Sequence, residues 1–85
     1  MASSRLLIKP SAAKELEVLP KKFRARVVER ISGLASASRP PGSEKLSAEE
    51  KYRVRQGLYR VVYAVDDRAR TVLIVKIGSR KDVYR

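Results

Sequence analysis

The sequence contains no cysteine, no histidine and no tryptophan. Without cysteine there is no disulfide bond, no thiolate nucleophile and no cysteine-ligated zinc. Without histidine, the chain lacks the usual general base of enzymes and the commonest metal ligand. Any chemistry must therefore come from arginine, lysine, tyrosine, serine or carboxylate side chains, and we expect neither a metal ion nor another cofactor.

Long apolar runs are also missing. No stretch approaches the roughly 18 apolar residues of a membrane-spanning helix, and the apolar run near the N-terminus is too short for the core of a signal peptide. We therefore expect a cytoplasmic protein with no membrane contact. The length of 85 residues indicates one domain over residues 1–85, and a hydrophobic content of 44% indicates that it folds.

What the sequence has in excess is positive charge. Its 20 lysine and arginine residues against 9 acidic residues give a formal net charge of +11. Ten of the basic residues but only three of the acidic ones lie in residues 51–85. Such a chain is typical of proteins that bind nucleic acids, although charge alone is equally compatible with a solubilising surface. The positions of the charges must decide between the two.

The N-terminal half predicts one strand followed by two helices. A short apolar stretch over residues 5–9 is closed by Pro10, which cannot donate a backbone hydrogen bond to a sheet. A short helix is expected over residues 11–19, and Pro20 separates it from a second helix. The apolar positions of the second helix recur at spacings of four, four and three: Phe23, Val27, Ile31 and Leu34. Its charged side chains are expected to face water: Lys22, Arg24, Arg26, Glu29 and Arg30.

The C-terminal half predicts three strands, which follow a loop of turn-forming residues at 36–43. The strands are expected over residues 52–55, 58–65 and 71–77, with Gly78 ending the last one. The resulting order is β-α-α-β-β-β. This is an α+β fold in which an αα-hairpin packs on one face of a small, mostly antiparallel sheet.

Arginines gather on one face of the hairpin predicted between the second and third strands. If Gln56 and Gly57 form a two-residue turn, Arg53 lies directly opposite Arg60. Two further basic residues follow on that face: Lys51 and Arg55. The other face suits contact with the helices: Tyr52, Val54, Tyr59, Val61 and Tyr63. Residues 51–65 contain no carboxylate to offset the arginines, which favours a bound phosphate backbone over an ordinary solvated face.

Residues 79–85 add further cations and one aromatic side chain: Arg80, Lys81 and Tyr84. An exposed tyrosine among cations is a common arrangement for stacking an unpaired base. The alternative is that Tyr84 packs inward and anchors the terminus.

Two segments together resemble the RelE branch of the RelE/ParE toxin superfamily. They are Tyr-Arg-Val-Arg-Gln-Gly-Leu-Tyr-Arg-Val-Val-Tyr at residues 52–63 and Val-Lys-Ile-Gly-Ser-Arg-Lys-Asp-Val-Tyr at residues 75–84. The resemblance covers the whole chain. It implies a toxin of a type II toxin–antitoxin system that enters the ribosomal A site and cleaves messenger RNA there by attack of the RNA 2′-hydroxyl. It also implies a cognate antitoxin, which we expect to be acidic, partly disordered and helix-forming on binding.

The resemblance also assigns catalytic roles. Arg53 and Arg55 match two basic residues that line the cleft, and Arg60 matches the arginine that holds the scissile phosphate. Arg80 matches the arginine that stabilises or protonates the leaving group, and Tyr84 matches the tyrosine that stacks on the target base. Further RNA contacts are expected from three lysines: Lys51, Lys76 and Lys81.

The sequence departs from many relatives at two places. Both cleft residues are arginine where lysine is common, and Ser79 stands where many relatives have histidine. Arginine is a poor proton acceptor because its pKa is about 12.5–13.8, so the general base is left unidentified. Two alternatives stay open: a ParE-like toxin, which shares the fold but poisons DNA gyrase, and an inert basic binding module. Arg80 and Tyr84 favour the ribonuclease.

Overall fold

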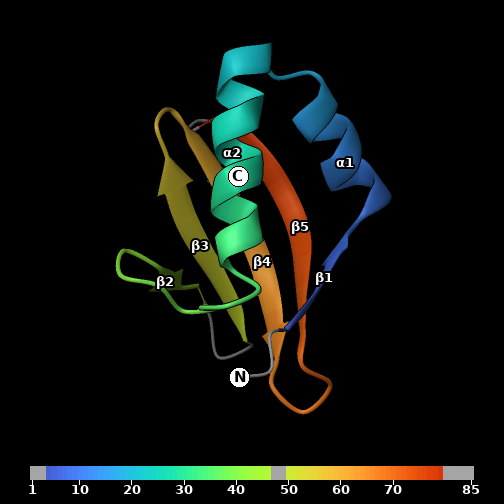
Figure 1. Cartoon of the computed structure of the whole chain (residues 1–85), viewed down its shortest axis with the longest axis vertical. Helices are drawn as coiled ribbons and strands as arrows, with labels where there is room; N and C mark the ends of the chain where they lie inside the picture. The colour runs from blue at the N-terminus through green and yellow to red at the C-terminus, as the bar shows by residue number, and fades with distance from the viewer. Residues whose placement is uncertain (1–3, 47–49, 80–85) are drawn as a thin grey trace.

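The computed structural model describes residues 4–46 and 50–79 of the chain. Its elements in chain order are β1 Arg5–Ile8, α1 Pro10–Glu17, α2 Lys21–Gly33, β2 Glu44–Lys45, β3 Lys51–Gln56, β4 Tyr59–Asp66 and β5 Thr71–Ser79. Both helices lie over the same face of the sheet (Figure 1). The predicted α+β architecture, with an αα-hairpin on one sheet face, is confirmed.

The sheet has the strand order β1-β5-β4-β3-β2. β1 pairs with β5 in parallel, from Arg5 opposite Thr71 to Ile8 opposite Ile74. The other three pairings are antiparallel, so the prediction of a mostly antiparallel sheet is also confirmed. The two central strands, β4 and β5, carry most of the buried apolar residues of the sheet.

Two predictions about the strands are wrong. The sheet has a fifth strand, β2, which consists of Glu44 and Lys45 paired with β3. Two residues are too few to show a periodic pattern in the sequence. Gly78 does not end β5, because β4 offers backbone partners as far as Ser79, which pairs with Tyr59. The hydrogen-bonded neighbour here outweighs the weak strand preference of glycine.

A register shift in β5 allows Ile74 and Ile77 to face the core from the same side of the sheet. Val62 pairs with Lys76 and Tyr63 pairs with Ile74, so Val75 is an extra residue in the ladder. Without this bulge, Ile74 and Ile77 would lie on opposite faces because their spacing is odd. Both side chains are instead only 1% exposed.

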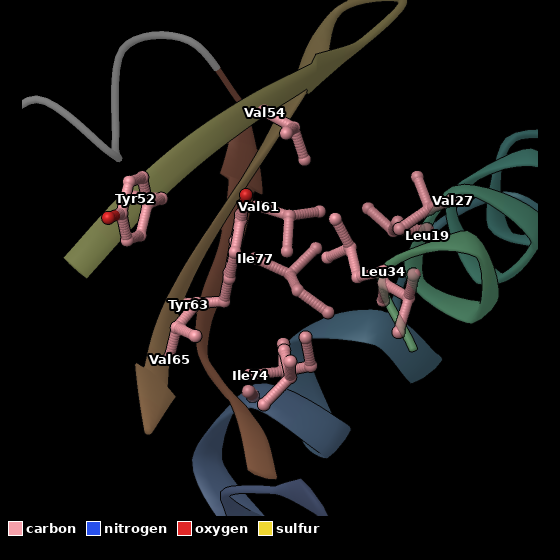
Figure 2. Close-up of a cluster of buried hydrophobic side chains, with 13 residues drawn as sticks. Leu19, Val27, Leu34, Tyr52, Val54, Val61, Tyr63, Val65, Ile74 and Ile77 are labelled. Carbon is pink, nitrogen blue, oxygen red and sulfur yellow. The ribbon is translucent and has the colours of Figure 1, made fainter. Parts of the chain in front are cut away.

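The core lies between the helices and the sheet (Figure 2). The predicted stripe on α2 is largely buried, with Val27, Ile31 and Leu34 in the core. Removal of this apolar surface from water is the main force holding the helices on the sheet. Within residues 4–46 and 50–79, neither helix combines the length and the apolar character that a membrane span requires.

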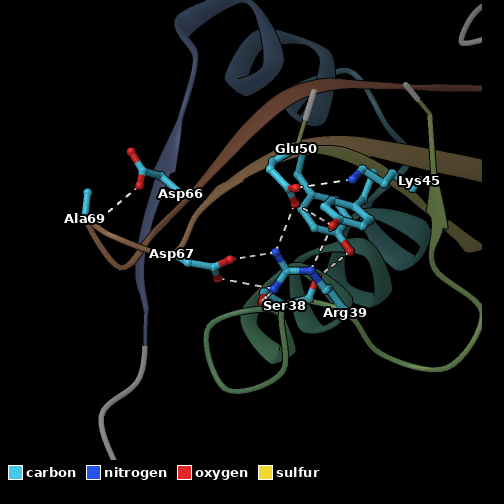
Figure 3. Close-up of polar contacts among 9 residues, drawn as sticks. Ser38, Arg39, Lys45, Glu50, Asp66, Asp67 and Ala69 are labelled. Carbon is cyan, nitrogen blue, oxygen red and sulfur yellow. Dashed lines mark hydrogen bonds and ion pairs between the residues drawn. The ribbon is translucent and has the colours of Figure 1, made fainter. Parts of the chain in front are cut away.

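A polar cluster fastens the loop between α2 and β2 to one end of the sheet (Figure 3). We call it the Arg39 clamp, and its members are Arg39, Lys45, Glu50, Tyr52 and Asp67. The Arg39 Nη2 lies 2.9 Å from Asp67 Oδ2 and 3.0 Å from Glu50 Oε2. Arg39 Nε donates to Tyr52 Oη at 2.8 Å, and that hydroxyl donates to Glu50 Oε2 at 2.6 Å.

The Arg39 clamp joins segments that are distant in the sequence. Asp67 follows β4, Glu50 precedes β3, and Arg39 belongs to the loop. The loop is fastened a second time by Tyr63, whose hydroxyl donates to the Ser38 carbonyl at 2.7 Å. These contacts fix the path of residues 38–43, which form one wall of the site described below.

The pKa of Glu50 makes the Arg39 clamp sensitive to acid. Hydrogen bonds from Tyr52, Arg39 and Lys45 lower the pKa of Glu50 from 4.5 to about 2. A carboxyl group with a lowered pKa stabilises the folded state fully above its ordinary pKa, and this contribution is lost as the pH falls through the folded-state value.

Glu50→Gln should therefore melt at a lower temperature than the parent protein at neutral pH, and the gap should close between pH 4.5 and about 2. Thermal unfolding followed by circular dichroism across this range measures the gap. Glu17→Gln, on α1 and outside the clamp, is the control and should show no such gap. A difference between Glu50→Gln and the parent that stays constant down to pH 2 would contradict the assignment.

Candidate functional site

The β3–β4 hairpin determines which arginines face one another. The turn consists of Gly57 and Leu58, and Gln56 pairs with Tyr59. Arg55 therefore lies opposite Arg60, and Arg53 lies opposite Val62. The prediction that Arg53 faces Arg60 is wrong. Gly57 takes the first turn position, where its φ of +60° is the conformation that favours glycine.

The faces of the hairpin are nevertheless those predicted. The pairing differs from the expected one by two residues, and an even shift leaves every side chain on the same face. Val54, Val61 and Tyr63 are fully buried in the core, so the arginines of β3 and β4 lie on the other face.

Arg60 is the deepest of these arginines. Arg60 is only 3% exposed, and no other charged residue is buried in the part of the chain that the structure describes. Removing a guanidinium from water is costly unless other groups or a ligand stabilise it, so a buried arginine at a surface hollow is a candidate functional residue. Its direct neighbour across the ladder is another cation, Arg55.

A hollow of about 330 Å³ collects the arginines from three elements. We call it the arginine hollow, and it is lined by Arg30 of α2, Gly42 of the loop, Glu44 of β2, Arg53 and Arg55 of β3, and Arg60 of β4. The lining includes four guanidinium groups and one carboxylate. Guanidinium groups in such a cluster bind phosphate oxygens through paired N–H donors.

Glu44 was missed at the level of the sequence. It pairs with Arg53 across the β2–β3 ladder and forms an ion pair with the Arg53 side chain. Glu44 is 60% exposed, whereas the Arg53 side chain is 13% exposed. The sequence offers only a weak indication of its role, an acidic residue directly after a loop of proline, glycine and serine. The strand in which it lies has only two residues.

Arg30 was also missed, because its charge placed it among the solvent-facing residues of α2. It follows the buried Val27 by three positions and precedes the buried Leu34 by four, so it borders the apolar stripe. The Arg30 side chain is half-buried and lines the arginine hollow.

Burial raises the pKa of the Tyr63 phenol, and the positive charges of Arg30 and Arg39 oppose that rise.

Two of the three lysines expected to contact RNA, Lys51 and Lys76, are not in the lining of the arginine hollow. Lys51 is exposed at the start of β3, opposite Ala64, and is not part of the hollow. Lys76 Nζ lies 3.2 Å from Glu15 Oε2 of α1. The same carboxylate accepts the backbone N–H of Ile77 at 3.0 Å, beyond the point where β1 ends.

Three other expected site residues lie outside the described residues: Arg80, Lys81 and Tyr84. Of the expected site, the structure brings together Arg53, Arg55 and Arg60.

Comparison with known proteins gives consistent results. The family model described as the ParE toxin of type II toxin–antitoxin systems matches residues 6–84. Toxin RelG of Mycobacterium tuberculosis is 34% identical over 77 residues, which is 88% of each chain. Toxin RelE of the same species is 38% identical over 80 residues, covering 92% of this chain and 82% of the relative. In the solved RelBE2 toxin–antitoxin complex of that species, one chain superposes with a TM-score of 0.81 at 28% identity and covers 94% of both chains.

Inorganic phosphate should stabilise the folded protein, because the arginine hollow exists only in the folded state. We expect low millimolar phosphate to raise the melting temperature more than sodium chloride of matched ionic strength. The extra rise should vanish in Arg60→Met, which keeps an unbranched apolar stem but removes the charge. Arg68→Met, in the exposed β4–β5 turn, is the control. Equal stabilisation of both variants by phosphate would place anion binding outside the hollow.

Proposed function

This chain belongs to the RelE/ParE superfamily of toxins of type II toxin–antitoxin systems, and we propose that it is an endoribonuclease that cleaves messenger RNA in the ribosomal A site. The observation that carries the proposal is the arginine hollow, with Arg53, Arg55 and the buried Arg60 in one lining. The negatively charged oxygens of a phosphodiester are the groups that clustered guanidiniums bind.

The proposed reaction takes its nucleophile from the RNA. The 2′-oxygen attacks the adjacent phosphorus, a bond forms between them, and the bond from phosphorus to the 5′-oxygen of the next nucleotide breaks. The products are a 2′,3′-cyclic phosphate and a 5′-hydroxyl. Since the nucleophile is already in the substrate, the step requires no protein nucleophile and no metal-bound water.

The arginines act on the charge that develops during this step. Negative charge grows on the non-bridging oxygens as the 2′-oxygen approaches, and Arg60 and Arg55 stabilise it from a partly water-excluded position. Preorganised donors of this kind lower the barrier because they need not reorient as the charge forms. Arg80 and Tyr84 complete the proposed set through the family resemblance, as leaving-group and base-stacking residues.

Glu44 is our candidate for the proton acceptor. Among the described residues that line the arginine hollow, it is the one carboxylate. Its ion pair with Arg53 holds it beside the cluster, and an ionised carboxylate accepts a proton far more readily than a guanidinium does. The proton from the 2′-hydroxyl would pass to Glu44, and Arg80, in the role that the family resemblance assigns to it, would protonate or stabilise the departing 5′-oxygen.

The antitoxin is the second part of the proposal. A groove between β1, α1 and α2 is lined largely by apolar residues, including Leu7, Ile8 and Val28, which are 45%, 41% and 43% exposed. Such a surface beside a strongly basic one suits an acidic partner with an amphipathic helix. The solved relative of Mycobacterium tuberculosis is itself a toxin–antitoxin complex.

Removing the charge of Arg60 should abolish cleavage without unfolding the protein. We expect Arg60→Met to lower the rate of messenger RNA cleavage on programmed ribosomes by roughly 100-fold or more, as loss of a preorganised charge-stabilising donor does. Primer extension on the programmed message reads the cut sites, and Arg68→Met is the control. If the parent protein makes no cuts at the A site and instead causes gyrase-dependent DNA breaks, the ParE-like alternative is correct.

Glu44→Gln should slow cleavage by about 100-fold or more, the usual contribution of a positioned base. Single-turnover cleavage on programmed ribosomes, at one pH for all variants, measures the rates. Glu29→Gln, which removes a carboxylate of α2 outside the arginine hollow, is the matched control and should cleave at the parental rate. Equal rates for Glu44→Gln and the parent would exclude Glu44 as the base.

A further inference from the structure

Arg30 occupies a position that no role has yet explained. It lines the arginine hollow and also a second hollow of about 490 Å³ beside α2. The second hollow is lined by Arg26, Glu29, Arg30, Gly33 and Gln56. Among the described residues, Arg30 is the one that the two linings share, so its side chain borders both hollows.

One donor atom of the Arg30 side chain has no internal acceptor. Its Nε is buried and has no hydrogen-bond partner among the described residues. A buried N–H without an acceptor costs free energy, and native proteins retain such a group where it serves a ligand or stores strain. In Arg30 the group belongs to a cation at the border of a solvent-accessible hollow, which favours an anionic ligand.

The surroundings of Arg30 leave its charge largely uncompensated. Arg26 lies one helical turn earlier and has the same sign, which is unfavourable at this spacing. Glu44, the carboxylate of the arginine hollow, forms its ion pair with Arg53. Glu29 lines the second hollow only. An anion placed between the two hollows would therefore meet a net positive field.

The loop backbone lies close to the Arg30 guanidinium. Gly42 has a φ of +90°, and a Cβ built on it would lie 4.0 Å from Arg30 Nη2. The loop therefore passes Arg30 without a side chain in between. The Arg39 clamp and Tyr63 hold this loop in place, so the position of Gly42 beside Arg30 is fixed.

We propose that Arg30 binds the phosphate adjacent to the scissile one, so that the RNA strand runs from the arginine hollow into the second hollow beside α2. This inference rests on the proposed ribonuclease function. RNA carries one phosphate per nucleotide, so a strand with one phosphate at Arg60 presents its next phosphate one step along the path. Two adjoining hollows with a shared guanidinium fit such a repeated charge better than they fit an acidic peptide with irregular charge spacing.

The test uses the full chain and short RNA oligonucleotides made non-cleavable by a 2′-deoxy substitution at the reactive nucleotide. Binding is measured against salt concentration for the parent, Arg30→Met and Arg24→Met. Arg24 lies on the same helix, outside both hollows, and donates to the Glu17 carbonyl. We expect Arg30→Met to reduce the slope of log K against log salt by about 0.7, the loss of one phosphate contact to a single strand. Arg24→Met should leave the slope unchanged.

Oligonucleotide length provides a second readout. Adding one nucleotide on the correct side of the scissile phosphate should tighten binding to the parent but not to Arg30→Met. The melting temperature of Arg30→Met should equal or exceed that of the parent, because the substitution removes an unpartnered buried N–H. An unchanged salt slope, or a large fall in melting temperature, would overturn the proposal.

The test also separates this inference from the function on which it rests. If Arg60→Met loses ribosomal cleavage while Arg30→Met keeps the parental salt slope, the ribonuclease assignment stands and the role of Arg30 is refuted. If neither substitution affects cleavage, the assignment itself fails. A weaker affinity of Arg30→Met for the antitoxin, with an unchanged salt slope, would make the second hollow a protein-binding site and overturn the proposal.

Discussion

Two guanidinium groups face each other across the β3–β4 ladder, and the rest of the molecule holds them there. Arg55 and Arg60 are directly paired, and Arg60 is almost completely buried. Like charges at this spacing repel each other. The opposing stabilisation comes from the other face of the same strands, where Val54 and Val61 pack under the helices. The hydrophobic core thus offsets the repulsion at the surface for which we propose anion binding.

Stability and binding chemistry occupy different ends of the sheet. The Arg39 clamp ties the loop to β3 and β4 through acidic partners. The arginine hollow lies further along β3, and its described lining has four arginines and one carboxylate. The loop over residues 35–43 connects the two regions, since Arg39 anchors it and Gly42 borders the hollow. In the described part of the chain, acidic side chains are thus concentrated in the clamp and sparse at the site that we propose for an anion.

Features that follow from a regular spacing of apolar residues were predictable from the sequence. Features that depend on how the strands pair with one another were not. The stripe of α2 and the two faces of the hairpin follow from spacing alone. The register of the hairpin depends on which turn position Gly57 takes, the bulge at Val75 depends on β4, and β2 exists only as a partner of β3. The same limit applies to the site. Arg53, Arg55 and Arg60 share one hairpin, whereas Arg30 and Glu44 reach it only through tertiary packing.

The parallel pairing of β1 with β5 has a consequence for the order of folding. β3 and β4 are joined by a two-residue turn and can pair as soon as both exist, but Arg5 must find Thr71 across nearly the whole described chain. Contacts of such long sequence separation form late, because loop closure must precede any stabilisation. During synthesis, β1 and the helix that follows it therefore wait for β5 to leave the ribosome. The complete sheet, and with it the folded surface of the domain, can therefore form only after residues 71–79 have emerged from the ribosome.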